Sequence, residues 1–375
     1  MQVSWDPDLE TLTFHHIRRL RDGKATDLLG DGSALTVIRR EPNLEQATLD
    51  GRLTASLQPE DLRVGDTLDI AYTRVRRDPA MRGHSETLIG PTDGVSVGRY
   101  RLRLLWPSSK PVQWRAYPGA LKPVLRKFGS DNELLADLTD VRTSLPPAGA
   151  PSRFTVINSV NVSDFASWAA VSATLAPALA KAGKLAANSP LRAEAARIAA
   201  VSRDPKVRAE LALQLVEQKV RYLFLSMRDG GYIPADADLT WTRRFGDCKA
   251  KTVLLIALLN ELGIEARPVL VNTGSGDFVS ERLPALGAFN HVIAQATIAG
   301  QSYWLDGTRL GDTKLDRLVT PNYRSGLPIL ARNAALVPIV PAPLRLPSED
   351  IKPRARFHGG DRHRGQGARR ASFPR

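Results

Sequence analysis

The stretch RRFGDCKAKTVLLIALLNELG, residues 243–263, decides the fold of this chain. An almost unbroken apolar run follows Asp247, a residue type that favours the N-cap position of a helix. The run ends before Gly263, which suits the position just after a helix. The pattern therefore predicts a helix that is buried on most sides. Because such a helix lies inside the molecule, its first turn lies at an internal surface or a cleft, and Cys248 belongs to that turn.

The residues after this helix predict a small antiparallel sheet. Residues 266–271 have the composition of a strand, and a loop rich in Gly, Ser and Asp follows them. Residues 291–298 and 302–305 flank a turn centred on Gly300 and predict a hairpin. Helix followed by hairpin indicates an α+β arrangement for this part of the chain.

Three segments upstream carry helical patterns: residues 163–182, 190–201 and 205–220. Ser163 and Asp164 are placed to cap the first of them. In the third segment, four apolar residues can form one buried face: Val207, Leu211, Leu215 and Val220. Any packed helix shows such a face, so we interpret it as core.

The first 160 residues have a different pattern. Short alternating runs are separated by Gly, Pro and Asp turns, with no helical pattern between them: residues 11–17, 34–39, 64–75, 100–105, 112–116 and 154–160. The clearest is 64–75, in which Leu68, Ile70 and Tyr72 alternate with polar or small residues. This half is predicted to be an antiparallel β-sandwich.

The net charge of +13 is unevenly distributed along the chain. Residues 352–375 hold eight Arg and Lys residues and one Asp, so this short segment carries +7. We predict that it is a disordered basic tail, and we expect no specific nucleic-acid binding. A frame-shifted or truncated end of the coding region is our hypothesis for its origin.

The single cysteine excludes several classes of site. Cys248 cannot form an intramolecular disulfide or supply the cysteine pairs of a zinc ribbon, an Fe–S site or a CxxC centre. The sequence also lacks HExxH and GxxxxGK motifs, so we predict neither a metal site nor a cofactor.

No segment of the sequence has the pattern of a membrane or export signal. The longest uncharged stretch, residues 284–305, contains Pro, Gly, Asn, His and Gln, so no membrane span is predicted. The N-terminus has neither a basic nor an apolar signal region. The expectation is a cytoplasmic protein as written, or a periplasmic or exported one if the true start lies upstream. The oligomeric state stays open.

Two polar residues downstream can complete a nucleophilic site with Cys248. His291 begins the first strand of the predicted hairpin, and Asp306 follows the second. A short turn brings the start of one strand beside the end of the other, so these two side chains can meet. A helix N-terminus favours a thiolate, because its free N–H groups and its dipole attract negative charge. The order Cys248, His291 and Asp306 on a helix and two neighbouring strands predicts a catalytic triad. In it, His291 takes the proton of Cys248 and Asp306 fixes the tautomer of His291.

Structural interpretations of the same residues stay open at this point. A lone cysteine in an apolar helix is commonly a small buried residue. A histidine beside a strand is commonly hydrogen-bonded for structural reasons, and Asp-Gly after a strand is commonly a turn.

Three motifs match a known family in order and at plausible separations: GDCK at residues 246–249, NHV at 290–292 and WLDGT at 304–308. With the surrounding sequence, they resemble the transglutaminase-like superfamily, in particular bacterial members with a GDCKDK signature that follow a domain of unknown function 3857. WDPDLETLTFHHIRRLRDG at the N-terminus and RVGDTLDIAYT at residues 63–73 look like that companion domain.

The resemblance implies a papain-like, cysteine-protease-like core with Cys248 as nucleophile, His291 as base and Asp306 as the orienting carboxylate. The predicted organisation is a β-sandwich over residues 1–162, a helical connection that starts the catalytic domain at 163–220, a transglutaminase-like catalytic core at 221–335 and a Pro-rich, then basic and disordered tail at 336–375.

Function stays divided between three alternatives. Attack by water on the acyl-thioester would make the protein a peptidase or amidase acting on a protein or peptide, and attack by an amine would make it a transamidase. A catalytically inactive binding or scaffold protein that keeps the fold is the other possibility. Ala250 favours that last one slightly, because related sequences usually have Asp there.

Overall fold

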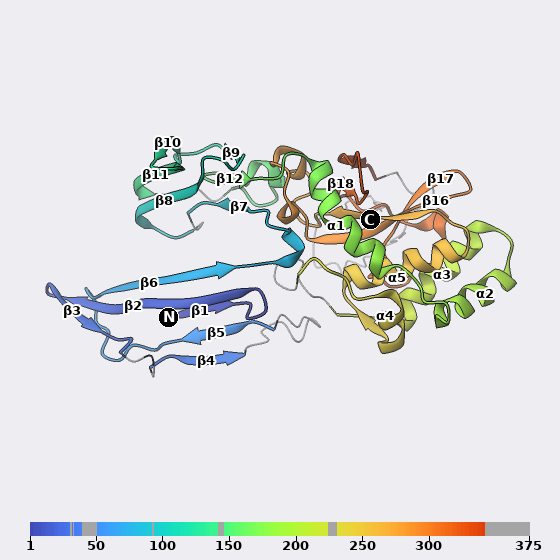
Figure 1. Cartoon of the computed structure of the whole chain (residues 1–375), viewed down its shortest axis with the longest axis horizontal. Helices are drawn as coiled ribbons and strands as arrows, with labels where there is room; N and C mark the ends of the chain where they lie inside the picture. The colour runs from blue at the N-terminus through green and yellow to red at the C-terminus, as the bar shows by residue number, and fades with distance from the viewer. Residues whose placement is uncertain are drawn as a thin grey trace, which may run out of the picture.

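The computed structural model describes most of the chain. Described are residues 1–341 apart from residues 31, 33, 40–50, 92–93, 142–145 and 224–230. The predicted basic tail lies outside the described residues. Figure 1 shows sheets throughout the first half of the chain and helices packed with a sheet in the second half, which confirms the predicted α+β class.

Six strands form the first two sheets, each with three strands. Their bounds are Gln2–Trp5 (β1), Glu10–Arg21 (β2), Lys24–Asp27 (β3), Thr36–Arg39 (β4), Leu53–Ser56 (β5) and Thr67–Arg76 (β6). The strand orders are β1-β5-β4 and β3-β2-β6, and every pairing is antiparallel. Val3, Ile17 and Ala55 are buried here.

The next six strands form two further three-stranded sheets, β10-β11-β8 and β7-β12-β9. Their bounds are Glu86–Ile89 (β7), Val97–Pro107 (β8), Gln113–Ala116 (β9), Val124–Phe128 (β10), Asp131–Val141 (β11) and Val160–Ser163 (β12), with 3-10 turns at Pro79–Met81 (η2) and Ser152–Phe154 (η3). A separate small core, including Leu102, Leu134 and Val160, lies between them.

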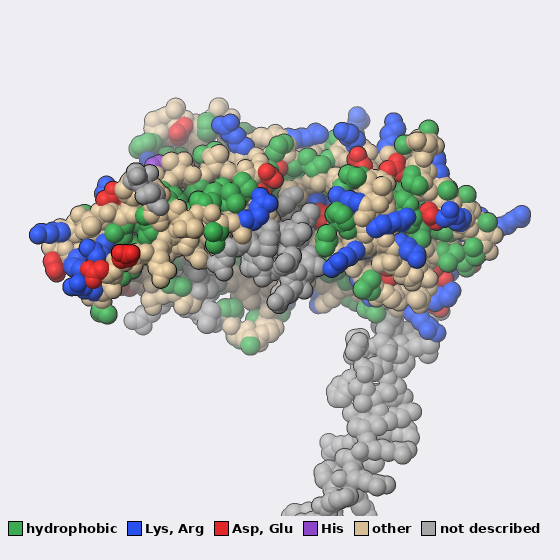
Figure 2. Space-filling model, turned by 90° about the horizontal axis from the view of Figure 1, so that it is seen from below, with side chains coloured by type: hydrophobic (Ala, Val, Ile, Leu, Met, Phe, Trp, Pro, Cys, Tyr) green, Lys and Arg blue, Asp and Glu red, His purple; other side chains and the backbone are tan. Residues whose placement is uncertain are grey.

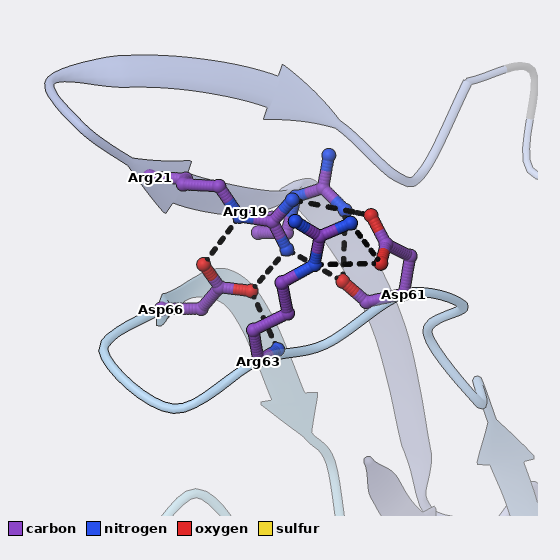
Figure 3. A network of polar contacts seen from close by, with 5 residues as sticks. All are labelled: Arg19, Arg21, Asp61, Arg63 and Asp66. Carbon is purple, nitrogen blue, oxygen red and sulfur yellow. Dashed lines mark hydrogen bonds and ion pairs between the residues drawn. The ribbon is translucent and has the colours of Figure 1, made fainter.

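A polar network at the surface fastens the turn before β6 to the end of β2 (Figure 3). Arg21 donates two hydrogen bonds of 2.7 Å to the carboxylate of Asp66. It also pairs with Asp61 at 3.1 Å, and Arg63 and Arg19 meet the same Asp61 carboxylate. The side chain of Asp61 is half exposed. Exposed ion pairs of this kind contribute little to stability.

The described residues of the second half form five α-helices: Trp168–Ala182 (α1), Pro190–Val201 (α2), Pro205–Lys219 (α3), Ala237–Arg243 (α4) and Cys248–Glu261 (α5). The predicted buried helix is α5, in which every residue from Cys248 to Leu259 is buried. It packs against α2, α3 and α4 and against strands β15 and β16 of the large sheet. This helix therefore lies at the centre of the main hydrophobic core.

The large sheet has five antiparallel strands in the order β17-β16-β15-β18-β19. Their bounds are Ala266–Val271 (β15), His291–Ile298 (β16), Gln301–Leu305 (β17), Arg324–Pro328 (β18) and Val337–Ile339 (β19). The 3-10 turns η4 (Val279–Glu281), η5 (Leu286–Ala288) and η6 (Leu315–Arg317) lie in its connections, and β13 (Arg221–Tyr222) pairs with β14 (Phe245–Gly246) in parallel.

Three details of the sequence prediction are wrong. The strand expected at 154–160 starts only at Val160, because η3 and the left-handed backbone of Asn158 (φ 49°) interrupt it. The helix expected from residue 163 begins at Trp168, capped by Ser167, because Ser163 is taken up by β12.

The third error concerns the buried face of α3. Of the four predicted residues, Val220 is buried, but Val207, Leu211 and Leu215 are only partly buried. The fully buried side of the helix instead includes small residues and two carboxylates: Ala209, Glu210, Ala212, Leu213, Val216 and Glu217. The helix is thus rotated relative to the predicted face, so that polar side chains point into the protein.

The two halves are joined by hydrogen bonds to the segment that leads into β16. Glu86 in β7 accepts a hydrogen bond of 2.6 Å from the N–H of Leu286. Ser163 at the end of β12 donates one of 2.6 Å to the carbonyl of Pro284. The sheet β7-β12-β9 therefore contacts the same connection that ends at His291.

In the described part of the chain, no helix is both long and apolar enough to cross a bilayer. On the face shown in Figure 2, Lys and Arg side chains are dispersed over both halves, with acidic side chains between them.

Candidate active site

The start of α5 presents Cys248 as the first residue of the helix. The side chain of Asp247 caps the helix by accepting the N–H of Ala250 at 2.9 Å, as predicted. The N–H groups of the first helical positions have no partner within the helix and give this end a positive potential. Cys248 is completely buried, with an exposed fraction of 0%. Its sulfur thus lies in the protein interior at an electropositive helix end.

His291 and Asp306 meet across the hairpin. Because Ala294 pairs with Leu305, the start of β16 lies beside the residue that follows β17. Nε2 of His291 and Oδ2 of Asp306 are 2.8 Å apart, and both side chains are buried. This contact uses Nε2, which leaves Nδ1 as the ring nitrogen for Cys248.

Thr308 fixes the other oxygen of the Asp306 carboxylate. Its backbone N–H and its hydroxyl donate to Oδ1 at 3.0 Å and 2.7 Å. Burial alone would raise the pKa of Asp306, but the hydrogen bonds from His291 and Thr308 outweigh it and hold that pKa below its usual value. The carboxylate is therefore ionised and held in one orientation.

The surroundings of His291 favour its charged form. Burial lowers the pKa of the imidazole, but the hydrogen bonds with Asp306 and Cys248 and their negative charges raise it to about 10. An imidazolium is thus stabilised between a carboxylate and the sulfur.

Lys249, which follows Cys248 in the sequence, is engaged by the helix cap. Its ammonium group is buried and pairs with the carboxylate of Asp247, without the geometry of a hydrogen bond. The positive charge next to Cys248 in sequence is therefore balanced by the helix cap.

Two tyrosines that the sequence prediction missed lie at this site. The ring of Tyr323 approaches that of His291 edge-on, with centroids 6.4 Å apart. Burial and the charge of Asp306 raise the pKa of Tyr323 to about 12. Burial and the negative charges of Cys248 and Asp247 raise the pKa of Tyr222. Both phenols thus stay protonated and can donate hydrogen bonds.

The pairing of β13 with β14 explains the position of Tyr222. Tyr222 lies opposite Gly246, two residues before Cys248, and the N–H of Leu223 donates to the carbonyl of Gly246 at 3.0 Å. Strands of two residues have no periodicity, so no sequence pattern indicated this contact.

A buried polar group behind the site was also missed. Lys251 is fully buried, and its ammonium group donates to the carbonyl of Val220. Burial lowers its pKa to about 8. On α3, burial and the nearby charge of Asp312 raise the pKa of Glu217 to about 7. Glu217 accepts the N–H of Asp312 at 3.1 Å and so binds the segment after Asp306 to α3.

A metal site is not evident in this part of the molecule. Among the residues that the structure describes, no three His, Cys, Asp or Glu side chains are grouped as metal ligands.

Two family models match the chain. Residues 1–143 match the model described as "Domain of Unknown Function with solved-structure structure (DUF3857)". Residues 192–306 match the core of the transglutaminase-like superfamily, and this range includes Cys248, His291 and Asp306. The chain carries a transglutaminase-like core domain. The predicted resemblance to this superfamily and to DUF3857 is thereby confirmed.

One solved structure supports the fold of the chain. A "putative protease" from Parabacteroides distasonis ATCC 8503 aligns with a TM-score of 0.69 at 16% identity. The alignment covers 91% of this chain and 64% of that one, so this chain spans less than two thirds of that protein's length. At this identity the likeness shows the fold alone.

Two further structures align less well. A "putative cysteine protease" from Cytophaga hutchinsonii has a TM-score of 0.27 at 14% identity, over 62% of this chain and 75% of that one. The periplasmic domain of TgpA from Pseudomonas aeruginosa has a TM-score of 0.24 at 15% identity, over 80% and 87%. No curated protein matches the chain significantly.

Proposed function

We propose that this chain transfers acyl groups from amide bonds of a protein or peptide to the thiol of Cys248. The observation that carries the proposal is the buried contact of 2.8 Å between His291 and Asp306, beside the only cysteine of the chain. A histidine that only fills a core needs no ionised partner. A histidine that acts as a base needs one, because the partner stabilises its imidazolium form.

In the proposed reaction, the proton of the Cys248 thiol first passes to Nδ1 of His291, and the thiolate then attacks the carbonyl carbon of the amide. A C–S bond forms, and the carbonyl oxygen becomes an oxyanion. The imidazolium then protonates the amide nitrogen, the C–N bond breaks and an amine leaves. The product is an acyl-thioester on Cys248, and Asp306 stabilises the imidazolium throughout.

The oxyanion needs hydrogen-bond donors that are already in place. The N–H groups at the start of α5 are such donors. The phenol of Tyr222 is a second one, because its raised pKa keeps the proton on the oxygen. We assign Tyr222 this role because its pairing with Gly246 places it beside the residue two positions before Cys248.

The thioester is resolved when water or an amine attacks its carbonyl carbon and the C–S bond breaks. Water gives a peptidase or amidase, and a primary amine gives a transamidase. The complete burial of Cys248 requires that neighbouring side chains move before either acceptor can enter.

The alternative is a binding or scaffold protein that retains the fold without turnover. Ala250 is the observation that favours it. This residue is buried in the first turn of α5, where related sequences usually place an acidic side chain.

The test is a product assay with an unfolded protein substrate, in the presence and absence of a fluorescent primary amine. Hydrolysis creates new chain ends or free acids, and transamidation attaches the amine, so mass spectrometry separates the two. We expect one of these products from the wild type and neither from the Cys248→Ser variant. If the wild type and the variant give the same products and no thioester adduct appears on Cys248, the scaffold alternative holds.

A further inference from the structure

Lys251 is a fully buried lysine one turn after Cys248 on α5, and the proposed reaction gives it no part. Residues three apart lie on the same side of a helix, so Lys251 and Cys248 share one side of α5. Lysine is almost never fully buried unless its charge has a partner. The partner of Lys251 connects it to the surroundings of Cys248.

The ammonium group of Lys251 holds the end of α3. It donates a hydrogen bond to the carbonyl of Val220, the residue at which α3 ends. The last carbonyl groups of a helix have no partner within the helix and attract positive charge. Helices α3 and α5 pack against each other (Figure 1). Lys251 therefore joins the end of α3 to the start of α5.

Strand β13 starts directly after Val220 and pairs with the turn before Cys248. The N–H of Arg221 donates to the carbonyl of Arg244 at 2.7 Å, and the N–H of Leu223 donates to the carbonyl of Gly246 at 3.0 Å. Tyr222 lies between these two hydrogen bonds. Two strands paired alone are marginally stable, so a further contact at the start of β13 matters for the position of Tyr222.

The stem of Lys251 lies against the other strand of this pair. Gly246 in β14 packs so closely on α5 that a Cβ there would be 3.0 Å from Cβ of Ala250 and 3.7 Å from Cγ of Lys251. The stem of Lys251 thus supports β14, while its ammonium group holds the residue before β13. One side chain therefore braces both strands from the interior.

Lys251 is also coupled to the charges of its surroundings. The negative charges of Glu217 and Asp306 raise its pKa, but burial outweighs them and lowers it to about 8. The ammonium form therefore dominates at pH 6. Because Asp306 orients His291, a test must separate an effect of Lys251 on Asp306 from an effect on β13.

We propose that Lys251 is a positioning residue of the active site, which fixes Tyr222 beside Cys248 by holding Val220 and supporting Gly246. The donor role of Tyr222 rests on the proposed function, whereas the brace rests on the contacts of Lys251. Lys251 forms and breaks no bond in the reaction. Its loss weakens the stabilisation of the oxyanion and leaves the formation of the thiolate unchanged.

The test compares two reagents for Cys248 on the full chain. The thiolate adds to the carbonyl carbon of a peptide aldehyde, a C–S bond forms, and the oxygen takes the negative charge and then the proton of His291. The affinity of the aldehyde therefore depends on the donors for the oxyanion. Iodoacetamide loses iodide as its carbon bonds to the sulfur and forms no oxyanion, so its rate reports on the thiolate.

The variant Lys251→Met should change one of these two measurements. We expect aldehyde binding about tenfold weaker than in the wild type, as for the loss of about one hydrogen bond. The alkylation rate at pH 6 should stay within about twofold. Unchanged aldehyde binding, or a comparable fall in the alkylation rate, would overturn the proposal, because the latter shows an effect on Asp306 and His291.

A double-mutant cycle tests whether Lys251 acts through Tyr222. Tyr222→Phe should weaken aldehyde binding by a similar factor. Lys251→Met and Tyr222→Phe together should lose no more than the stronger of the two single variants. Losses that multiply would show two independent effects and overturn the proposal.

The matched control removes a buried hydrogen bond to the backbone elsewhere. Ser172 in α1 is buried, and its hydroxyl lies 3.0 Å and 2.9 Å from the carbonyl oxygens of Pro328 and Leu330. Ser172→Ala should lower the melting temperature and leave aldehyde binding within about twofold. An equal loss of aldehyde binding in Ser172→Ala would show a general effect of core damage and overturn the role of Lys251.

Hydrogen exchange tests the brace without a substrate. In Lys251→Met, the N–H groups of Arg221 and Leu223 should exchange faster, whereas the N–H of Ala250, which donates to Asp247, should keep its rate. Lys251→Gln is the second variant and should give the same results. If neither variant folds, Lys251 serves the core alone and the proposal is wrong.

The outcomes separate this inference from the proposed function. A wild type that binds the aldehyde at Cys248, with variants of Lys251 that bind it equally well, overturns the role of Lys251 alone. A wild type that forms neither an aldehyde adduct nor a product overturns the proposed function. The exchange of Arg221 and Leu223 then still decides whether Lys251 holds β13 in place.

Discussion

Two groups of ion pairs show how burial changes what a charge does in this chain. At the surface of the first half, Asp61 shares its carboxylate among arginines, and its own side chain is half exposed (Figure 3). In the second half, His291 and Asp306 are both nearly inaccessible. The carboxylate of Asp61 can exchange its arginine partners for water. The buried side chains of His291 and Asp306 cannot exchange each other for water.

This difference assigns the two groups to different tasks. Exposed pairs are screened by salt and add little to stability, so the surface network mainly fixes a turn. Buried charges are costly unless each has a partner, and a buried pair persists only where its geometry is exact enough to repay desolvation. Functional sites are where such arrangements are concentrated.

The largest expected effect comes from removing the buried carboxylate. Asp306→Asn keeps the shape of the side chain but removes the charge that stabilises the imidazolium. We expect turnover in the product assay to fall by a factor on the order of 10²–10⁴. The pKa of His291, followed by NMR of its ring, should fall from about 10 because its strongest acceptor is lost.

The matched control changes a carboxylate of the surface network in the same way. Asp61→Asn should leave turnover within about twofold, since exposed ion pairs affect mainly their own surroundings. Comparable losses of turnover in the two variants would contradict the distinction between the groups.

A smaller effect is expected from the buried carboxyl group of Glu217. Its pKa is raised to about 7, so the folded state holds this proton more tightly than the unfolded chain does. The stability of the wild type therefore falls as the pH rises from about 4.5 through 7. Glu217→Gln removes this loss, and thermal unfolding should show a gain of about 1 kcal/mol at pH 8 and little change at pH 5.

Glu210 provides the control on the same helix. It pairs with Lys314 at 2.7 Å and accepts the N–H of Leu315. Glu210→Gln therefore removes a favourable ion pair, whereas Glu217→Gln removes the cost of a buried negative charge. Its effect at pH 8 should have the opposite sign. If Glu217→Gln also destabilises the protein at pH 8, the assignment of Glu217 as a penalised charge is wrong.

The smallest effect is expected for stability in the surface network. Hydrogen bonds from Arg21 and Arg63 lower the pKa of Asp61, so its contribution is present above the usual carboxyl range and is lost as the pH falls below it. Asp61→Asn should lower the melting temperature slightly at pH 7, and 1 M salt should abolish the difference. A large decrease that persists in salt would contradict this account.

Local patterns were sufficient to predict much of the fold and the meeting of His291 with Asp306. The hairpin of β16 and β17 fixes that contact through a short turn, with Ala299 and Gly300 in left-handed conformations. The burial of α5 followed from its composition, because a helix that is apolar on nearly all sides must be enclosed.

The missed residues depend on contacts between distant segments. Tyr222 reaches the site through a pairing of two-residue strands. Glu217 and Lys251 are charged residues on helices, a pattern that normally indicates solvent, and the segment after Asp306 buries Glu217 by packing on α3. The start of α1 was misplaced because Ser163 and Ser167 suit a cap equally well, and strand pairing decides between them.

The central claim is that the buried pair of His291 and Asp306 makes Cys248 a nucleophile and not an inert core residue. The most direct test is the rate of alkylation by iodoacetamide at pH 6, for the native chain and for the chain unfolded in urea. Because the chain has a single cysteine, every adduct reports on Cys248.

The two interpretations give opposite results in this measurement. Activation predicts that the native wild type reacts faster than its unfolded form and that His291→Ala reverses this order. An inert buried thiol is protected by its fold, so slower reaction of the native wild type than of the unfolded chain, with no further change in His291→Ala, would contradict the account.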